Sequence, residues 1–147
     1  MYTPLISAGL TYAYLKSRHP VPTKEQIIGL SDQWLMAVCS HNATAVADKY
    51  ASNGILVGTV AERIKVGRKD IKTYFDRFLQ KPALCGRFEN HIVQLFDGLA
   101  INSGTYTFGW KEGEEEVFVP ARFTFVYCYT PADGWKIANH HSSALPE

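Results

Sequence analysis

The chain has 147 residues, of which 46% are apolar and 20% are charged. That length and composition fit one globular domain and exclude a disordered chain, a collagen and a coiled coil. The formal net charge of +1 offers no basic excess for binding nucleic acid. No apolar run approaches the roughly 18 residues that a membrane-spanning helix requires. The sequence therefore predicts neither nucleic acid nor a membrane as a partner.

The three cysteines, Cys39, Cys85 and Cys128, are widely spaced and include no C-x-x-C pair. An odd number of separated cysteines is typical of free thiols in a reducing compartment rather than of a disulfide framework. The sequence therefore predicts three buried free thiols and a cytoplasmic location, in preference to secretion or an organelle.

Residues 1–22 differ in character from the rest of the chain. Residues 5–15 are mildly apolar but are interrupted by polar and tyrosine side chains, with no basic segment before them and no clear cleavage site after them. A loosely docked N-terminal arm is the favoured interpretation, and a degenerate leader is the alternative. Pro20 and Pro22 separate this segment from a single domain predicted over residues 23–147.

Helices are predicted mainly in the first half of the domain. Thr23 and Gln26 form a capping box, and apolar residues at helical spacing then continue to about His41. Asn42 can cap a short second helix that runs through Tyr50 and is ended by Asn53-Gly54. Short strands at 55–60 and 61–67 and a third helix at about 69–80 follow.

The second half of the domain predicts long antiparallel strands. Alternating apolar residues indicate strands over 84–96, 99–110, 117–129 and 135–143. Asp97-Gly98 is a two-residue hairpin signal, and Gly104 or Gly109 is the predicted position of a bulge. The acidic residues 111–116 are expected to form a solvated hairpin tip.

Helices that precede strands favour an α+β fold over alternating βαβ units. Four curved strands cannot close a barrel around themselves, so we expect the long first helix to cover their concave face. The predicted architecture is a cone-shaped, curved antiparallel sheet wrapped around that helix. A cone with one open end is a pocket for a small molecule.

Specific runs of residues then suggest a family. They are Ala121-Arg122-Phe123-Thr124-Phe125-Val126-Tyr127, Asp133-Gly134-Trp135-Lys136-Ile137, His140-His141-Ser142-Ser143, and the earlier Gly67, Ile71 and Tyr74-Phe75. Over residues 23–146 the chain resembles the nuclear transport factor 2-like superfamily. Within it, the chain is similar to SnoaL-like and SgcJ/EcaC-type proteins and to the association (hub) domain of calcium/calmodulin-dependent protein kinase II.

The resemblance implies a fold more firmly than a function, because this scaffold carries many activities. The hub domain holds small carboxylates with arginines at positions that fall near Thr105 and Phe125 and at Ser142 in this chain. None of these positions is an arginine here. Arg122 would supply one positive charge from a different strand position.

The histidine pair His140-His141 is the most conspicuous chemical feature. Adjacent residues on a regular strand point to opposite faces, so the two imidazoles cannot chelate one metal ion, and no metal site is predicted. Trp135 and Ile137 are core residues by type, which predicts that His141 shares their face and points into the cone. Its role there is either acid/base catalysis or that of a core histidine bonded to a tyrosine.

Arg122 lies in the middle of a strand, where a covered arginine needs a partner. It either pairs with Glu89 or anchors a substrate, and tyrosines with hydroxyl groups are expected on the cone wall. The catalytic candidates are therefore His141 and Arg122. The predicted ligand-binding set is Tyr50, Glu89, Tyr106, Arg122, Tyr127 and His141.

Two classes of function follow. The first is a stand-alone hub-like module that forms homodimers or rings of dimers and has a small-molecule pocket. It rests on an aromatic sheet face too large for one helix to cover (Phe108, Trp110, Phe118, Phe123, Phe125, Tyr127 and Tyr129). The alternative is a SnoaL-like acid/base isomerase, cyclase or hydrolase. No cofactor motif is present, so no cofactor is predicted for either.

Overall fold

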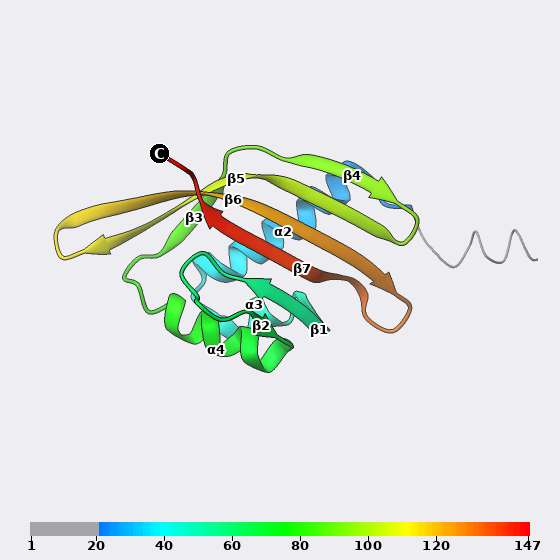
Figure 1. The fold of residues 1–147 in the computed structure, drawn as a ribbon, viewed down its shortest axis with the longest axis horizontal. Coiled ribbons are helices and arrows are strands. Elements are labelled where there is room, and N and C mark those ends of the chain that lie inside the picture. The colour runs from blue at the N-terminus through cyan, green and yellow to red at the C-terminus, as the bar shows by residue number, and fades with distance from the viewer. Residues whose placement is uncertain (1–20) are drawn as a thin grey trace, which may run out of the picture.

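The computed structural model describes residues 21–147 (Figure 1). The predicted arm or leader at 1–22 therefore lies almost wholly outside the described residues. None of the helices in 21–147 is long and apolar enough to cross a membrane. In chain order the elements are α2 (Lys24–Cys39), α3 (Ala43–Ala47), β1 (Tyr50–Val57), β2 (Lys65–Val66), α4 (Arg68–Phe78), β3 (Cys85–Phe88), β4 (Ile92–Phe96), β5 (Leu99–Glu112), β6 (Glu115–Thr130) and β7 (Gly134–Ala144).

The strands form one curved sheet in the order β2-β1-β7-β6-β5-β3. Strand β4 pairs with the same edge of β5 as β3 does, along residues 99–103 of β5. All pairs are antiparallel except β1 with β7, which is parallel. Helix α2 runs across the concave side of the long strands (Figure 1). Helix α4 lies beside β1 and β2, which form one edge of the sheet. The predicted α+β cone is confirmed, with one parallel pair added to the antiparallel sheet.

Local capping signals set the helix starts as predicted. The Thr23 hydroxyl accepts from the Gln26 backbone N–H, and the Gln26 side chain accepts from the Thr23 N–H. The Asn42 side chain accepts from the Ala45 N–H and begins α3. The predicted end of α3 at Tyr50 is wrong, because α3 ends at Ala47 and Tyr50 is already the first residue of β1.

The region predicted as one strand at 84–96 is two strands, β3 and β4, which pair with successive parts of β5. Residues between them bend the chain, and the Asn90 side chain accepts from the Thr105 N–H at 2.9 Å. Asn90 lies directly against Gly104, where a Cβ atom would collide with its carbonyl oxygen. Gly104 is therefore required for this close approach.

The pairing of β5 with β6 is uninterrupted from Leu99 to Glu112, so no bulge lies in β5 itself. On the other edge of β5, the segment between β3 and β4 has one extra residue opposite Gly104 and Thr105, because Phe88 pairs with Tyr106 and Ile92 pairs with Ser103. Another bulge lies in β7. Ile137 pairs with Tyr127, and Asn139 pairs with Val126, which leaves Ala138 as an extra residue on β7.

The core is an aromatic cluster between α2 and the sheet. Trp34 of α2 is 1% exposed and packs against rings from both α4 and the sheet, at centroid distances of 5.1–6.3 Å. The sheet aromatics Phe108, Phe123, Phe125 and Tyr127 are buried by this packing within one chain. The expectation that they form an uncovered aromatic face is therefore wrong, and Phe118 at 64% exposure is the main exception.

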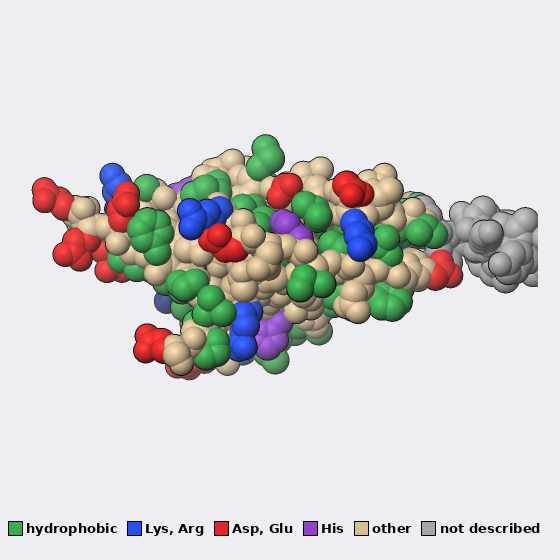
Figure 2. All heavy atoms as spheres, turned by 90° about the horizontal axis from the view of Figure 1, so that it is seen from above, with side chains coloured by type: hydrophobic (Ala, Val, Ile, Leu, Met, Phe, Trp, Pro, Cys, Tyr) green, Lys and Arg blue, Asp and Glu red, His purple; other side chains and the backbone are tan. Residues whose placement is uncertain are grey.

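Cys39 and Cys85 form a disulfide bond between the end of α2 and the start of β3. Cys128 is the remaining thiol and is half-buried. The prediction of three free thiols is therefore wrong, and the cytoplasmic location loses the argument that supported it, because disulfides persist mainly in oxidising compartments. The acidic residues at the β5–β6 tip are solvated as expected and gather at one end of the molecule (Figure 2).

The disulfide closes a loop with a sequence separation of 46 residues. We expect Cys39→Ser to lower the free energy of unfolding by about 2–4 kcal/mol, because the cross-link restricts the unfolded chain. Urea denaturation followed by circular dichroism measures the loss. Cys128→Ser is the control and should change stability little. A thiol count of three per denatured, unreduced chain would contradict the bond.

Candidate functional site

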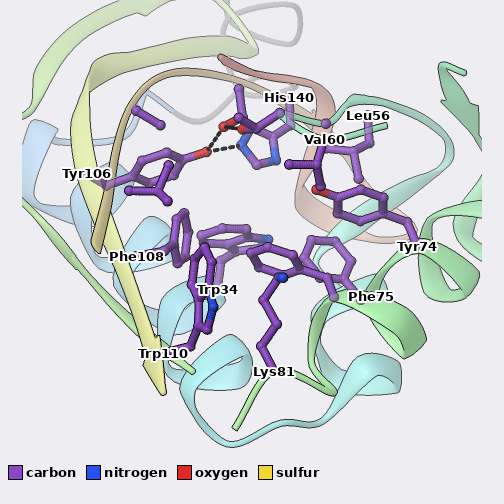
Figure 3. A pocket seen from close by; sticks show the side chains of 16 residues that line it. Trp34, Leu56, Val60, Tyr74, Phe75, Lys81, Tyr106, Phe108, Trp110 and His140 are labelled. Carbon is purple, nitrogen blue, oxygen red and sulfur yellow. Dashed lines mark hydrogen bonds between the residues drawn. The ribbon is translucent and has the colours of Figure 1, made fainter. Parts of the chain in front are cut away.

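The mouth of the cone leads to an apolar cavity of about 140 Å³ (Figure 3). Its walls come from α2, α4, the end of β1 and the inner faces of β5, β6 and β7. Most lining side chains are aromatic or aliphatic, and His140, Tyr106, Ser142 and Thr59 supply polar groups. The lining residues are Trp34, Leu56, Gly58, Thr59, Val60, Tyr74, Phe75, Phe78, Lys81, Tyr106, Phe108, Trp110, Val119, Ala121, His140 and Ser142.

His140 stands at the centre of a buried hydrogen-bonded chain. The Tyr50 hydroxyl accepts from Trp34 Nε1–H at 3.1 Å and lies 2.8 Å from Nδ1 of His140. On the other side of the ring, Nε2 lies 3.1 Å from the Tyr106 hydroxyl, which donates to Ser142 Oγ at 2.6 Å. Figure 3 shows Tyr106 and His140 meeting at one side of the cavity.

The direction of this chain follows from its first member, because an indole N–H can only donate. The Tyr50 oxygen accepts from Trp34, so its own hydrogen is free for Nδ1 of His140. We therefore assign the neutral imidazole hydrogen to Nε2, which donates to Tyr106. Each buried hydrogen then has an acceptor, as is usual for buried polar groups.

The chain ends at Thr59. Ser142 Oγ lies 2.5 Å from Thr59 Oγ1, and Ser142 already accepts from Tyr106. This contact uses one of the two hydroxyl hydrogens, whichever residue donates, so the other hydrogen is left over at the cavity wall. The cavity thus offers a ligand one hydrogen-bond donor at its polar side.

Burial keeps these groups neutral. Desolvation, with a smaller contribution from the neighbouring His141, lowers the pKa of His140 from 6.5 to about 3. Desolvation also raises the pKa of Tyr50 and Tyr106 well above the usual value of a phenol, and it raises the pKa of Tyr74 to about 12. At neutral pH the cavity therefore carries an uncharged imidazole and uncharged phenols.

A second polar cluster lies deeper under the sheet. The Ser31 hydroxyl is 2.8 Å from that of Tyr127, and the Asn102 amide donates to Ser31 Oγ at 2.9 Å. His91 Nδ1 is 3.0 Å from the same amide nitrogen. These residues do not line the cavity, so they support the packing of α2 on the sheet.

Because of the bulge at Ala138, His140 lies on the inner face of β7 in place of the predicted His141. A regular strand would place His141 on the face of Ile137, but the extra residue moves His140 and Ser142 to that face. Ile137 and His140 are buried at 1% and 2% exposure, whereas His141 is exposed on the outer face. His141 therefore does not point into the cone.

The other predicted residues divide between inside and outside. Tyr106 lines the cavity, and Tyr50 is hydrogen-bonded to His140, which also lines it. Tyr127 is buried beside Ser31. Arg122 is exposed on the outer face of β6. Glu89 bonds to Arg87 at 2.8 Å and to Thr107, not to Arg122, and it lies outside the cavity.

Sequence reasoning missed Trp34 as the anchor of the site and Lys81 as its charged group. Lys81 follows α4, and its ammonium lies 4.4 Å from the centre of the Trp110 ring. Lys81 stands just before Pro82, a residue that ends helices, so the local sequence indicates only the end of the third helix. Among residues 21–147, no group of three His, Cys, Asp or Glu side chains is arranged to hold a metal ion.

Comparison with known proteins places this fold in a family. The family model of the calcium/calmodulin dependent protein kinase II association domain matches residues 23–146. The chain belongs to this family. No curated protein sequence matches it.

Solved structures agree with this assignment. An association-domain protein from Xanthomonas campestris is 37% identical, with a TM-score of 0.79 over 86% of this chain and 90% of that one. A nuclear transport factor 2-like protein from Salmonella enterica (13%, TM-score 0.74, 84% and 92%) and a ketosteroid isomerase-like protein from Erwinia carotovora (15%, 0.67, 82% and 95%) share the fold.

The low pKa of His140 predicts an acid-sensitive fold. Below pH 6.5 the unfolded chain takes up a proton that the folded chain refuses until about pH 3. The stability from this group is present above pH 6.5 and is lost as the pH falls toward 3, at up to about 1.4 kcal/mol per pH unit. Urea denaturation between pH 7 and 4 should show a steeper loss for the wild type than for His140→Gln.

His141→Gln is the matched control, because it removes the neighbouring exposed imidazole. It should keep most of the wild-type dependence on pH, because burial is the main cause of the low pKa of His140. Equal slopes for the wild type and His140→Gln would show that His140 is protonated in the folded chain and would contradict the assignment.

Proposed function

We propose that this domain binds a small, largely apolar organic molecule in its cone. The observation that carries the proposal is the cavity itself. It is about 140 Å³ in volume, is walled by Trp34, Phe75 and Phe108, and has a polar side at Tyr106 and His140. Cavities of about 150 Å³ with apolar walls hold one benzene-sized ring.

Binding is favoured over acid/base catalysis by the state of the imidazole. A general base works best with a pKa near the operating pH, whereas burial lowers the pKa of His140 to about 3. Its two nitrogens are also occupied by Tyr50 and Tyr106. The enzyme names among the solved structures belong to chains about 15% identical, and that likeness concerns the fold.

Filling the cavity tests the proposal. Ala121 lines the cavity from β6 and is 1% exposed. We expect Ala121→Leu to weaken binding of single-ring molecules at least about tenfold, at a stability cost of about 1–3 kcal/mol from the added volume. Quenching of tryptophan fluorescence is a direct readout, because Trp34 and Trp110 line the cavity.

Ala132→Leu makes the same change in the exposed turn before β7 and should leave binding unchanged. Binding of ring compounds that is equal in both variants would contradict a site in the cone. The absence of binding by any single-ring compound to the wild type would overturn the proposal.

A second proposal is that the domain associates with copies of itself through the outer face of β5, β6 and β7. The family is named for association. The centre of this outer face carries mainly hydroxyl-bearing and branched side chains, together with one amide, one imidazole and one guanidinium, and no carboxylate. Its rows are Ile101, Val126 and Asn139; Ser103, Thr124 and His141; and Thr105, Arg122 and Ser143.

This surface suits a symmetric contact, because β-branched and hydroxyl side chains leave a flat sheet face that can stack on a second one. Arg122 and His141, which were predicted in the cone, would then belong to the contact between copies. A dimer is the smallest assembly of this kind, and a ring of dimers needs further contacts.

Light scattering after size exclusion tests this second proposal. We expect the wild type to have at least twice the chain mass of 16.5 kDa. Val126→Glu should reduce the mass to that of one chain, because it buries a charge between copies. Val66→Glu, at an exposed residue of β2, is the control and should leave the mass unchanged. A monomeric wild type would overturn the proposal.

A further inference from the structure

The disulfide bond exposes one of its two cysteines more than the other. Cys85 is exposed at the start of β3, whereas Cys39 at the end of α2 is half-buried. A groove of about 260 Å³ adjoins the bond, and its lining includes Cys85 but not Cys39. This outer groove shares only Trp110 with the cone cavity. A molecule that enters the outer groove therefore reaches the sulfur of Cys85 first.

A row of residues in register across three strands forms the floor of the outer groove. Cys85 pairs with Gly109, and Gly109 pairs with Phe118. The Phe118 ring lies against the glycine, because a Cβ atom at residue 109 would be 2.9 Å from it. Phe118 is 64% exposed, so an apolar ring is open to solvent close to the disulfide. The floor therefore offers apolar surface to the carbon atoms of a ligand.

The rim of the outer groove carries both signs of charge. Lys111 and Glu116 pair in register on β5 and β6, and both are exposed. The ion pairs found within residues 21–147 include neither of them, whereas Arg87 is held by Glu89 at 2.8 Å. A free ammonium and a free carboxylate in one groove complement a zwitterion, which carries the same two charges.

The backbone of β3 favours Cys39 as the sulfur that leaves when the bond is attacked. The Gly86 backbone N–H donates to Sγ of Cys39 at 3.4 Å. A hydrogen bond to sulfur stabilises its thiolate form, and a more stable thiolate leaves faster in disulfide exchange. Attack on Sγ of Cys85 from the outer groove therefore expels Cys39.

We infer that Cys85 is an exchange site for a small zwitterionic thiol, the class that includes cysteine and short cysteine-containing peptides. The small thiol loses its proton to water, and its thiolate attacks Sγ of Cys85. An S–S bond forms to Cys85, the bond to Cys39 breaks, and its electron pair leaves on the Cys39 sulfur, which takes a proton from water. The incoming sulfur is oxidised to a disulfide, and the Cys39 sulfur is reduced to a thiol. This site lies outside the cone and does not rest on the proposed functions.

Reaction of the native protein with glutathione, a zwitterionic peptide thiol, locates the exchange. Free thiols are trapped with N-ethylmaleimide, and peptides are mapped by mass spectrometry. We expect glutathione on Cys85 and the maleimide on Cys39. Glutathione on Cys39 or Cys128 in place of Cys85 would overturn the inference. A bond that opens only as fast as the whole chain unfolds would also overturn it, because an exposed sulfur can be attacked in the folded protein.

Rates of exchange test the role of the outer groove. Glutathione should react about threefold faster than uncharged 2-mercaptoethanol, after correction for the thiolate fraction and basicity of each thiol. Lys111→Met should lower the glutathione rate at least to that of 2-mercaptoethanol and leave the 2-mercaptoethanol rate unchanged. Lys69→Met is the control, because it removes the same charge from an exposed position on α4 outside the groove. Equal corrected rates in the wild type, or a preference that survives in Lys111→Met, would refute the inference.

Single-cysteine variants assign the attacked sulfur by a second route. With glutathione disulfide, Cys39→Ser should accumulate a mixed disulfide on Cys85, because no neighbouring thiol remains to displace the glutathione. Cys85→Ser should react at Cys39 at least about tenfold more slowly, because that thiol is half-buried and lies outside the groove. Equal rates in the two variants would contradict the assignment. Circular dichroism verifies that both are folded, and the wild-type rates test the inference without them.

Discussion

One extra residue in the last strand decides which side chains face the cavity. Ala138 bulges out of register between Ile137 and Asn139, so that Ile137 and His140 both point inward although they are three residues apart. The pairing of β1 with β7 is also irregular at this point, because β1 advances from Tyr50 to Ile55 while β7 advances only from Ile137 to Asn139. Without the bulge, His141 would face Trp34 and His140 would lie in solvent. The hydrogen-bonded chain from Trp34 to Thr59 exists because of this local geometry.

That chain explains how polar groups are tolerated in an aromatic core. A buried imidazole or phenol without a partner costs stability, but each of the two tyrosines and the histidine here both donates and accepts, in a chain that begins at the Trp34 indole and ends at the Thr59 hydroxyl. The rings around it exclude water, and the same exclusion lowers the pKa of His140. The arrangement is therefore suited to holding hydroxyl groups in place for a ligand and is poorly suited to proton transfer.

The sequence predicted those features that depend on neighbouring residues. It failed to predict those that depend on residues far apart in the chain. The capping residues Thr23 and Asn42 act within one helical turn, so both helix starts could be read directly. The fold class followed from the order of helices and strands. The bulge at Ala138 has no local signature such as glycine, so the inward histidine could not be assigned. The pairing of Cys39 with Cys85 depends on how α2 lies against β3, which spacing alone does not give.

The disulfide and the cavity are connected through β3. Gly86 follows Cys85, and a Cβ atom there would lie 2.8 Å from the Phe108 ring and 3.1 Å from Leu35 of α2. The strand can therefore lie close enough to α2 for the disulfide only because residue 86 has no side chain. Phe108 packs into the space that this glycine leaves and forms one wall of the cavity. The bond to Cys39 thus holds the wall against the helix that carries Trp34, so the cross-link that stabilises the cone also fixes the shape of its cavity.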